Sequence, residues 1–224
     1  MRPTGFSLTQ PVTNSIEINR VLRNTYFLLS LTLLFSAGCA WYAMASNAAP
    51  LGIFILLIGM FGLYFLTIAT RNSSWGLLSI MAYTGFMGYS IGPMLNFYIK
   101  TFSNGPQLII TALGATAVIF VGLSAYTLVS RKNFSYLGGA IAIGALLAFL
   151  VGIGAMLFHL PGLQLVVSGA FALISAGYIL FTTSAIINGG ERNYIMATIM
   201  LYVAIFNLFV SLLNILGALS GNRN

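Results

Sequence analysis

The chain has 224 residues, of which 59% are hydrophobic and only 5% are charged, and its mean hydropathy is +0.98. This composition excludes a water-soluble domain, because the surface of such a domain alone needs several times more charge. The net charge of +7 does not indicate nucleic-acid binding, since the basic residues are scattered over the predicted loops. The composition therefore predicts one polytopic helical domain whose main partner is the lipid bilayer.

Seven apolar runs follow one another along the chain, and each is long enough to cross a bilayer, which takes about 20 helical residues. They cover residues 24–45, 51–70, 75–99, 107–129, 137–158, 163–183 and 194–217. Before the first run, Asn14 and Glu17 are typical of a capping box and predict a helix start near Ser15. Gly92-Pro93 predicts a kink in the third run, since proline removes a backbone hydrogen bond.

These runs divide the chain into three parts. We expect a polar N-terminal tail over residues 1–20, a seven-helix transmembrane domain over residues 21–217 and a short C-terminal tail over residues 218–224. A cleavable signal peptide is the alternative for the first run, because Arg20 and Arg23 precede it and Ala43-Met44-Ala45 ends it. We interpret the run as a permanent span, since it is about 20 residues long and a signal peptide has 7–15 apolar residues.

Basic residues divide unequally between the two sides that seven spans define. The N-terminal side carries Arg2, Arg20, Arg23, Arg71, Arg131, Lys132 and Arg192, and the other side carries Lys100 and Arg223. Cytoplasmic loops of membrane proteins carry the excess of Lys and Arg. The division therefore predicts a cytoplasmic N-terminus and a C-terminus on the opposite side.

Polar side chains form one stripe on each of the last two runs. The positions are Ser168, Ser175 and Thr182 in the sixth run and Asn207, Ser211 and Asn214 in the seventh. The first three drift by only about 20° per step around a helix, and the last three lie within about 60° of one another. Exposure of amides and hydroxyls to lipid costs free energy. We therefore expect both stripes to lie inside the bundle and to face each other. The role of the stripes is left open: they could line a conduit, form a switch or only supply interhelical hydrogen bonds.

Small residues recur at four-residue spacing in two of the runs. The third run carries Gly88 and Gly92, and the fifth carries Gly144, Ala148 and Gly152. Such faces let two helix backbones approach closely. We predict that they pack within the monomer, ahead of a dimer interface.

No set of residues for catalysis can be assembled from this sequence. Aspartate is missing, and the two acidic residues, Glu17 and Glu191, fall outside the predicted spans. The one histidine, His159, lies in a short turn, and the one cysteine, Cys39, lies in the first run. Acid–base, nucleophilic and metal sites need partners that are not there. We therefore expect no enzyme activity, no cofactor and no metal.

Four segments resemble the Bax inhibitor-1 family, and its bacterial branch in particular. They are residues 21–37 (VLRNTYFLLSLTLLFSA), 84–98 (TGFMGYSIGPMLNFY), 124–139 (SAYTLVSRKNFSYLGG) and 180–216 (LFTTSAIINGGERNYIMATIMLYVAIFNLFVSLLNIL). The resemblance runs in register from about residue 20 to residue 217. It implies an all-α bundle of seven transmembrane helices in which the last helix is central.

The resemblance also implies where a charged latch would lie. In the calcium-leak members of the family, an aspartate on the sixth helix pairs with one on the seventh as a pH-sensitive latch. The matching positions are Thr182 and Ala204 in this chain. Neither side chain can carry charge, so the acidic latch is missing. Ala204 lies about 60° from Asn207, on the edge of the polar stripe.

The bacterial branch is associated with the membrane AAA protease FtsH, as slowly degraded substrates that limit proteolysis of other membrane proteins. A cytoplasmic N-terminal tail is the handle for extraction in that branch, and residues 1–20 suit this role. The resemblance therefore implies an interaction protein of the bacterial inner membrane that modulates FtsH. The alternative is a cation leak for calcium between the sixth and seventh helices, past Thr182, Asn207, Ser211 and Asn214.

Overall fold

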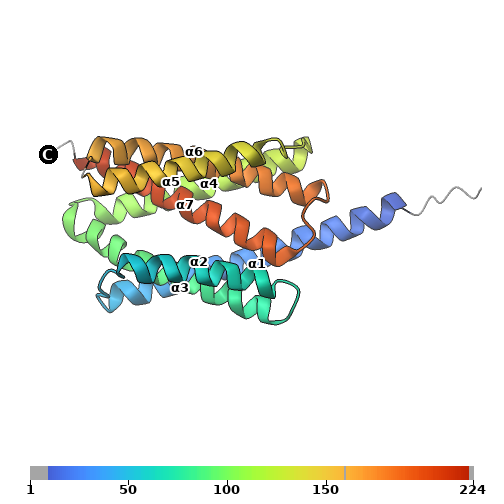
Figure 1. The fold of residues 1–224 in the computed structure, drawn as a ribbon, viewed down its shortest axis with the longest axis horizontal. Coiled ribbons are helices and arrows are strands. Elements are labelled where there is room, and N and C mark those ends of the chain that lie inside the picture. The colour runs from blue at the N-terminus through green and yellow to red at the C-terminus, as the bar shows by residue number, and fades with distance from the viewer. Residues whose placement is uncertain (1–9, 159, 222–224) are drawn as a thin grey trace, which may run out of the picture.

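The computed structural model describes residues 10–158 and 160–221, and His159 therefore lies outside the described residues. Seven α-helices, with no strand among the described residues, follow one another along the chain (Figure 1). They are α1 (Gln10–Ala45), α2 (Ile53–Thr70), α3 (Trp75–Thr101), α4 (Gly105–Ser130), α5 (Leu137–Leu157), α6 (Pro161–Ile187) and α7 (Tyr194–Gly221). Each predicted span corresponds to one of these helices, which confirms the all-helical class.

The helix ends differ from the predicted ends mainly near the termini. α1 begins at Gln10, so the prediction of a capping box at a start near Ser15 is wrong, and Asn14 lies inside the helix. The earlier start is compatible with Pro11, because proline in the first helical turn gives up no intrahelical hydrogen bond. α7 continues to Gly221, past the predicted end at residue 217.

All of these helices except α3 are long and apolar enough to cross a membrane. α3 has 27 residues, which span about 40 Å and are sufficient in length, but its sequence is more polar. Several of its polar side chains are buried, including Ser79 and Thr84, so they face neighbouring helices. α3 also continues as one helix through Pro93. The kink at this proline stays a prediction.

The helices form two groups with α7 between them in Figure 1. α1, α2 and α3 lie together on one side, and α4, α5 and α6 lie together on the other. α7 contacts α1, α2, α3, α4 and α6. Half of the most apolar stretch of α7 is buried, against 6% for α2 and for α5, so α2 and α5 present most of their surface outward.

Small residues set the closest helix contacts, as predicted. A Cβ added to Gly88 of α3 would collide with the backbone oxygen of Ser36 on α1. A Cβ added to Gly92 would lie 2.5 Å from the Cβ of Ala43, also on α1. These glycines therefore allow α1 and α3 to pack backbone to backbone within one chain.

The small residues of α5 face side chains of α6, at a looser contact than that between α1 and α3. A Cβ on Gly144 would lie 3.6 Å from Ile174, and one on Gly152 would lie 3.3 Å from Val167. Ala148, between them, is buried. The prediction that both small-residue faces pack within the monomer is confirmed.

Candidate functional site

The predicted polar stripes lie on two helices that pack along each other, α6 and α7. Two cavities lie beside their contact. The first has a volume of about 350 Å³, and its lining includes Ser175, Ala204 and Asn207. The second has a volume of about 570 Å³, and its lining includes the predicted positions Ser168, Asn207, Ser211 and Asn214. The structure therefore brings six of the seven predicted site residues to the walls of two adjoining spaces.

Asn207 is the residue at which these spaces meet. It lines both cavities, as does Phe171 of α6. Both residues also line a third, largely apolar space of about 680 Å³ that lies between α2 and α5. Asn207 therefore lies at the junction of three spaces, of which the third also reaches α2.

The hydrogen bonds of the stripes are mostly local. The Asn207 amide donates to the backbone oxygen of Val203 at 2.9 Å, and the Ser168 hydroxyl donates to that of Gln164 at 3.0 Å. Both bonds stay within one helix turn. Across residues 10–158 and 160–221, no side-chain hydrogen bond joins the stripe of α6 to that of α7. The stripes thus face common spaces without bonding to each other.

Asn214 differs from the other stripe residues because it joins two helices. Its Oδ1 accepts a hydrogen bond from the hydroxyl of Tyr98 on α3, at 3.1 Å. The Tyr98 ring also lies against Gly217, where an added Cβ would be 2.6 Å from the ring. Asn214 is therefore the stripe residue for which interhelical bonding is observed.

The two positions that the resemblance pairs as a latch, Thr182 and Ala204, are both buried. Thr182 is 0% exposed and Ala204 is 1% exposed. Ala204 packs in one cluster with Ile179, one helix turn before Thr182. Within the described part of the chain, the Thr182 hydroxyl has no hydrogen-bond partner. Thr182 is also the predicted site residue that lines neither of the two cavities.

A second buried polar cluster was missed by the sequence reasoning. The hydroxyl of Tyr202 on α7 lies 2.7 Å from Ser36 Oγ on α1 and donates to the backbone oxygen of Thr84 on α3, at 3.2 Å. Nearby, the Thr198 hydroxyl of α7 lies 2.7 Å from the backbone oxygen of Tyr194 in its own helix and 3.3 Å from that of Thr25 on α1. A tyrosine in the middle of an apolar run was the available signal, since a buried tyrosine hydroxyl usually has a partner.

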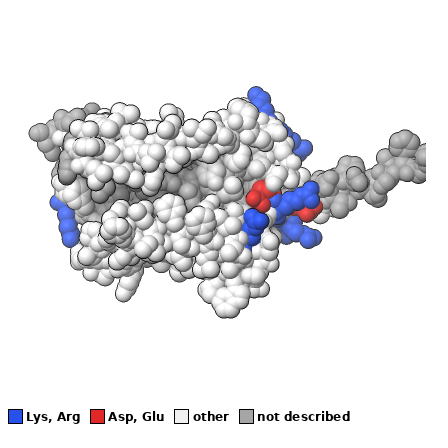
Figure 2. All heavy atoms as spheres, viewed as in Figure 1, with Lys and Arg blue, Asp and Glu red and all other residues white. Residues whose placement is uncertain are grey.

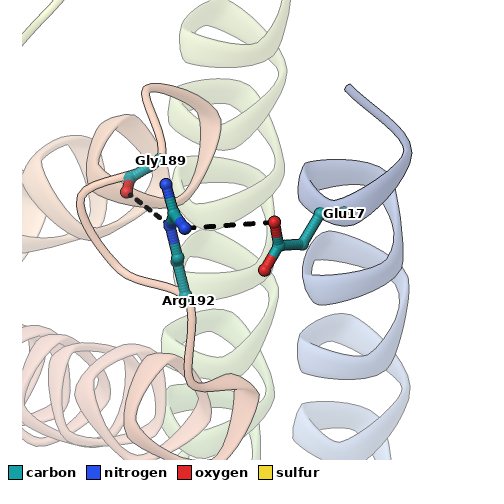
Figure 3. A network of polar contacts seen from close by, with 3 residues as sticks. All are labelled: Glu17, Gly189 and Arg192. Carbon is teal, nitrogen blue, oxygen red and sulfur yellow. Dashed lines mark hydrogen bonds and ion pairs between the residues drawn. The ribbon is translucent and has the colours of Figure 1, made fainter. Parts of the chain in front are cut away.

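Polar contacts also join α1 to the loop between α6 and α7 (Figure 3). Arg192 lies 4.0 Å from the carboxylate of Glu17, and its Nε donates to the backbone oxygen of Gly189 at 3.5 Å. Gly189 has a φ of 73°, which favours glycine. The contact is exposed, with 66% of the Arg192 side chain accessible, so it positions the loop more than it stabilises the fold.

Asn193 fixes the beginning of α7. Its Oδ1 accepts hydrogen bonds from the backbone N–H groups of Ile195 and Met196, at 3.0 and 3.1 Å, which is the usual geometry of an N-cap. Its Nδ2 donates to the backbone oxygen of Arg71 in the loop between α2 and α3.

Among the described residues, His, Cys, Asp and Glu form no group of three or more that could hold a metal ion.

Comparison with known proteins places the chain in a family. Residues 18–221 match the family model described as Inhibitor of apoptosis-promoting Bax1. An uncharacterized protein of Pseudomonas aeruginosa is 49% identical over 99% of this chain and 100% of its own length. Modulator of FtsH protease YccA of Escherichia coli is 49% identical over 92% and 93% of the two chains. Mouse Protein lifeguard 4 is 28% identical over 89% and 85%.

The same comparisons give the location. A relative from a second Escherichia coli strain, also 49% identical, is named Inner membrane protein YccA. Together with the apolar helices, this likeness identifies a multi-pass protein of the inner membrane. The family match covers every helix from α1 to α7. The chain is therefore a member of the Bax inhibitor-1 family.

Proposed function

We propose that this protein is an interaction protein that modulates the membrane AAA protease FtsH as a slowly degraded, competing substrate. The observation that carries the proposal is the 49% identity, over more than nine-tenths of both chains, to a relative named as a modulator of that protease. The family match starts at residue 18 and runs through α7, so it includes the bundle that would resist extraction by a protease. In this proposal the chain is a partner of the protease and not itself an enzyme.

The N-terminal tail over residues 1–20 is the proposed handle. It is polar, and its residues 10–20 form the first part of α1, the helix that a protease pulling from this end would remove first. We take residues 21–217 as the transmembrane bundle that resists removal and residues 218–224 as a short tail. A substrate of this form occupies the protease for as long as α1 stays packed in the bundle.

The contacts of α1 supply the resistance. α1 packs against α3 at the Gly88 and Gly92 contacts, and Ser36 of α1 bonds to Tyr202 of α7. The Thr198 hydroxyl of α7 also lies 3.3 Å from the backbone oxygen of Thr25 on α1. We propose α7 as the central helix of the bundle, because it contacts helices of both groups. Removal of α1 therefore disrupts packing on α3 and α7 in one step, which slows extraction.

The charge distribution supports a cytoplasmic position for the handle. In Figure 2, most Lys and Arg side chains gather at one end of the molecule, together with the acidic side chains, and one group lies at the opposite end. Because positively charged loops stay in the cytoplasm, we propose that the N-terminus is cytoplasmic and the C-terminus lies on the opposite side.

Deletion of residues 2–14 tests the proposal. We expect the shortened protein to persist longer than the wild type in cells that contain FtsH, and to protect a second FtsH substrate less. The matched control removes residues 222–224, at the other end. It should leave unchanged both the lifetime of this protein and the lifetime of the second FtsH substrate. Unaltered degradation and protection after deletion of residues 2–14 would contradict the proposal.

A cation leak is the second candidate function. The observation that favours it is the pair of cavities beside α6 and α7, which meet at Asn207 and together carry most of the polar stripe. Calcium flux into liposomes that hold the purified protein tests it. Flux no higher than in empty liposomes, at neutral and mildly acidic pH, contradicts this function and leaves the FtsH proposal untouched.

A further inference from the structure

A crevice opens on the side of the bundle between α1 and α4. The backbones of these two helices are not in contact at any described residue, although both are apolar enough to span a membrane. At one end the Tyr26 and Phe120 rings close the gap, with centroids 6.0 Å apart. Beyond them the gap widens into a cavity of about 310 Å³. The crevice therefore opens toward the bilayer and toward the end of the molecule opposite the N-terminus.

The walls of the crevice are apolar, and the hydroxyl groups in them are already bonded. Ala37 and Trp41 of α1 and Leu113 of α4 are exposed at its sides, and Phe206 and Phe209 of α7 lie deeper. The Ser36 and Tyr202 hydroxyls bond to each other, and the Thr116 hydroxyl donates to the backbone oxygen of Ala112 at 2.7 Å. Water gains no partners in such a space, so an apolar chain suits it better.

A positive charge lies just beyond the wide end of the crevice. Leu95 of α3 lines this end, and Lys100 follows five residues later, about 7 Å further along the helix. The Lys100 ammonium donates to Asn47 Oδ1 at 2.9 Å, which holds it beside the end of α1. In the described part of the chain, Lys100 is the one cation at this end of the bundle. An anionic group there would meet a fixed positive charge.

We propose that this crevice is a binding site for one acyl chain of an anionic glycerophospholipid, with the lipid phosphate beside Lys100. The chain fills the space over Phe206 and Phe209, where lateral entry from the bilayer requires no opening of the bundle. The bound lipid bridges α1 and α4, which lack backbone contact. This site is separate from the polar stripe and independent of the proposed action on FtsH.

Native mass spectrometry of the purified protein with an equal mixture of phosphatidylglycerol and phosphatidylcholine tests the site. We expect retained lipid on the wild type, with phosphatidylglycerol in excess. Ala37→Phe places a ring in the crevice mouth and should lower occupancy at least about tenfold. Ala117→Phe, on an exposed face of α4 outside the crevice lining, should leave it unchanged. Lys100→Gln should keep binding but remove the preference for the anionic lipid.

A second measurement keeps the proposal testable if Ala37→Phe fails to fold. A phosphatidylglycerol with a photoreactive acyl chain should label Trp41 and Leu113 of the wild type in preference to the outward faces of α2 and α5. Uniform labelling of all outward faces, or occupancy of Ala37→Phe equal to that of the wild type, would overturn the proposal.

Discussion

Ser36 and Tyr202 lie 166 positions apart in the sequence, yet their hydroxyl oxygens are 2.7 Å apart in the interior of the bundle. The same Tyr202 hydroxyl reaches the backbone oxygen of Thr84, so one side chain joins α1, α3 and α7. Tyr202 is 1% exposed, and its ring lies edge-on to that of Tyr83 at a centroid distance of 6.0 Å. These contacts make Tyr202 a residue that holds the first helix against the last.

Tyr202→Phe should therefore destabilise the bundle measurably. Hydrogen bonds between helices in membranes contribute about 0.6 kcal/mol on average and up to about 1.7 kcal/mol, and this variant loses two. Unfolding of the purified protein in mixed detergent micelles measures the change. Tyr42→Phe is the control, because Tyr42 is 63% exposed. Equal stability of the two variants would show that the buried hydroxyl contributes nothing.

Gly88→Ala should be more damaging than the loss of any one hydrogen bond. The added methyl group meets the backbone of Ser36, which cannot rotate away, so α1 and α3 must separate. Overpacking of this kind typically costs about 1–3 kcal/mol. Gly122→Ala in α4 is the matched control, since nothing lies within 4 Å of its added methyl group. Thermal unfolding compares the two, and a stable Gly88→Ala variant would contradict the close approach.

Asn207→Leu and Asn214→Leu should differ, although both residues belong to the same stripe. Asn214 bonds to Tyr98 on another helix, whereas Asn207 bonds to its own helix and faces open space. We expect Asn214→Leu to lose about 0.6 kcal/mol or more and Asn207→Leu to lose less. Unfolding in detergent measures both. The reverse order would indicate a partner for Asn207 that the fold of the single chain does not supply.

Thr182→Val should leave the stability of the bundle unchanged or raise it. The variant replaces a fully buried hydroxyl, which has no partner among the described residues, with a methyl group of similar size. A buried unsatisfied polar group costs free energy that the methyl group does not. Thr127→Val serves as the comparison, since the Thr127 hydroxyl donates to Leu123 at 2.8 Å. A marked loss for Thr182→Val alone would point to ordered water or an ion beside residue 182.

Under the proposed action on FtsH, Arg192→Gln should speed degradation of the protein without changing its fold. The exposed contact with Glu17 contributes at most about 1 kcal/mol, so its loss raises the rate of release of α1 by no more than about fivefold. Pulse-chase measurement of protein lifetime detects such a change. Arg131→Gln removes one charge from the same side of the bundle, away from α1, and should leave the lifetime as it is. An identical lifetime for all three proteins would mean that this contact does not restrain the handle.

Much of the fold was predictable from the sequence because its signals are local. Seven runs of the required length predicted seven helices, and the four-residue spacing of Gly88 and Gly92 predicted a close helix contact. The stripe positions were predicted to lie inside the bundle, and six of the seven predicted site residues line the cavities beside α6 and α7. The exception, Thr182, is fully buried and lines neither cavity.

The partners of these residues were decided by the tertiary structure alone. In a membrane protein the lipid-facing and buried sides of a helix are both apolar, so hydropathy does not show which side meets another helix. For this reason the sequence did not reveal that Tyr202 reaches Ser36, that Asn214 reaches Tyr98, or that α1 and α4 leave a crevice between them. The sequence determined the number of helices and their polar faces, and the packing of distant segments determined what those faces meet.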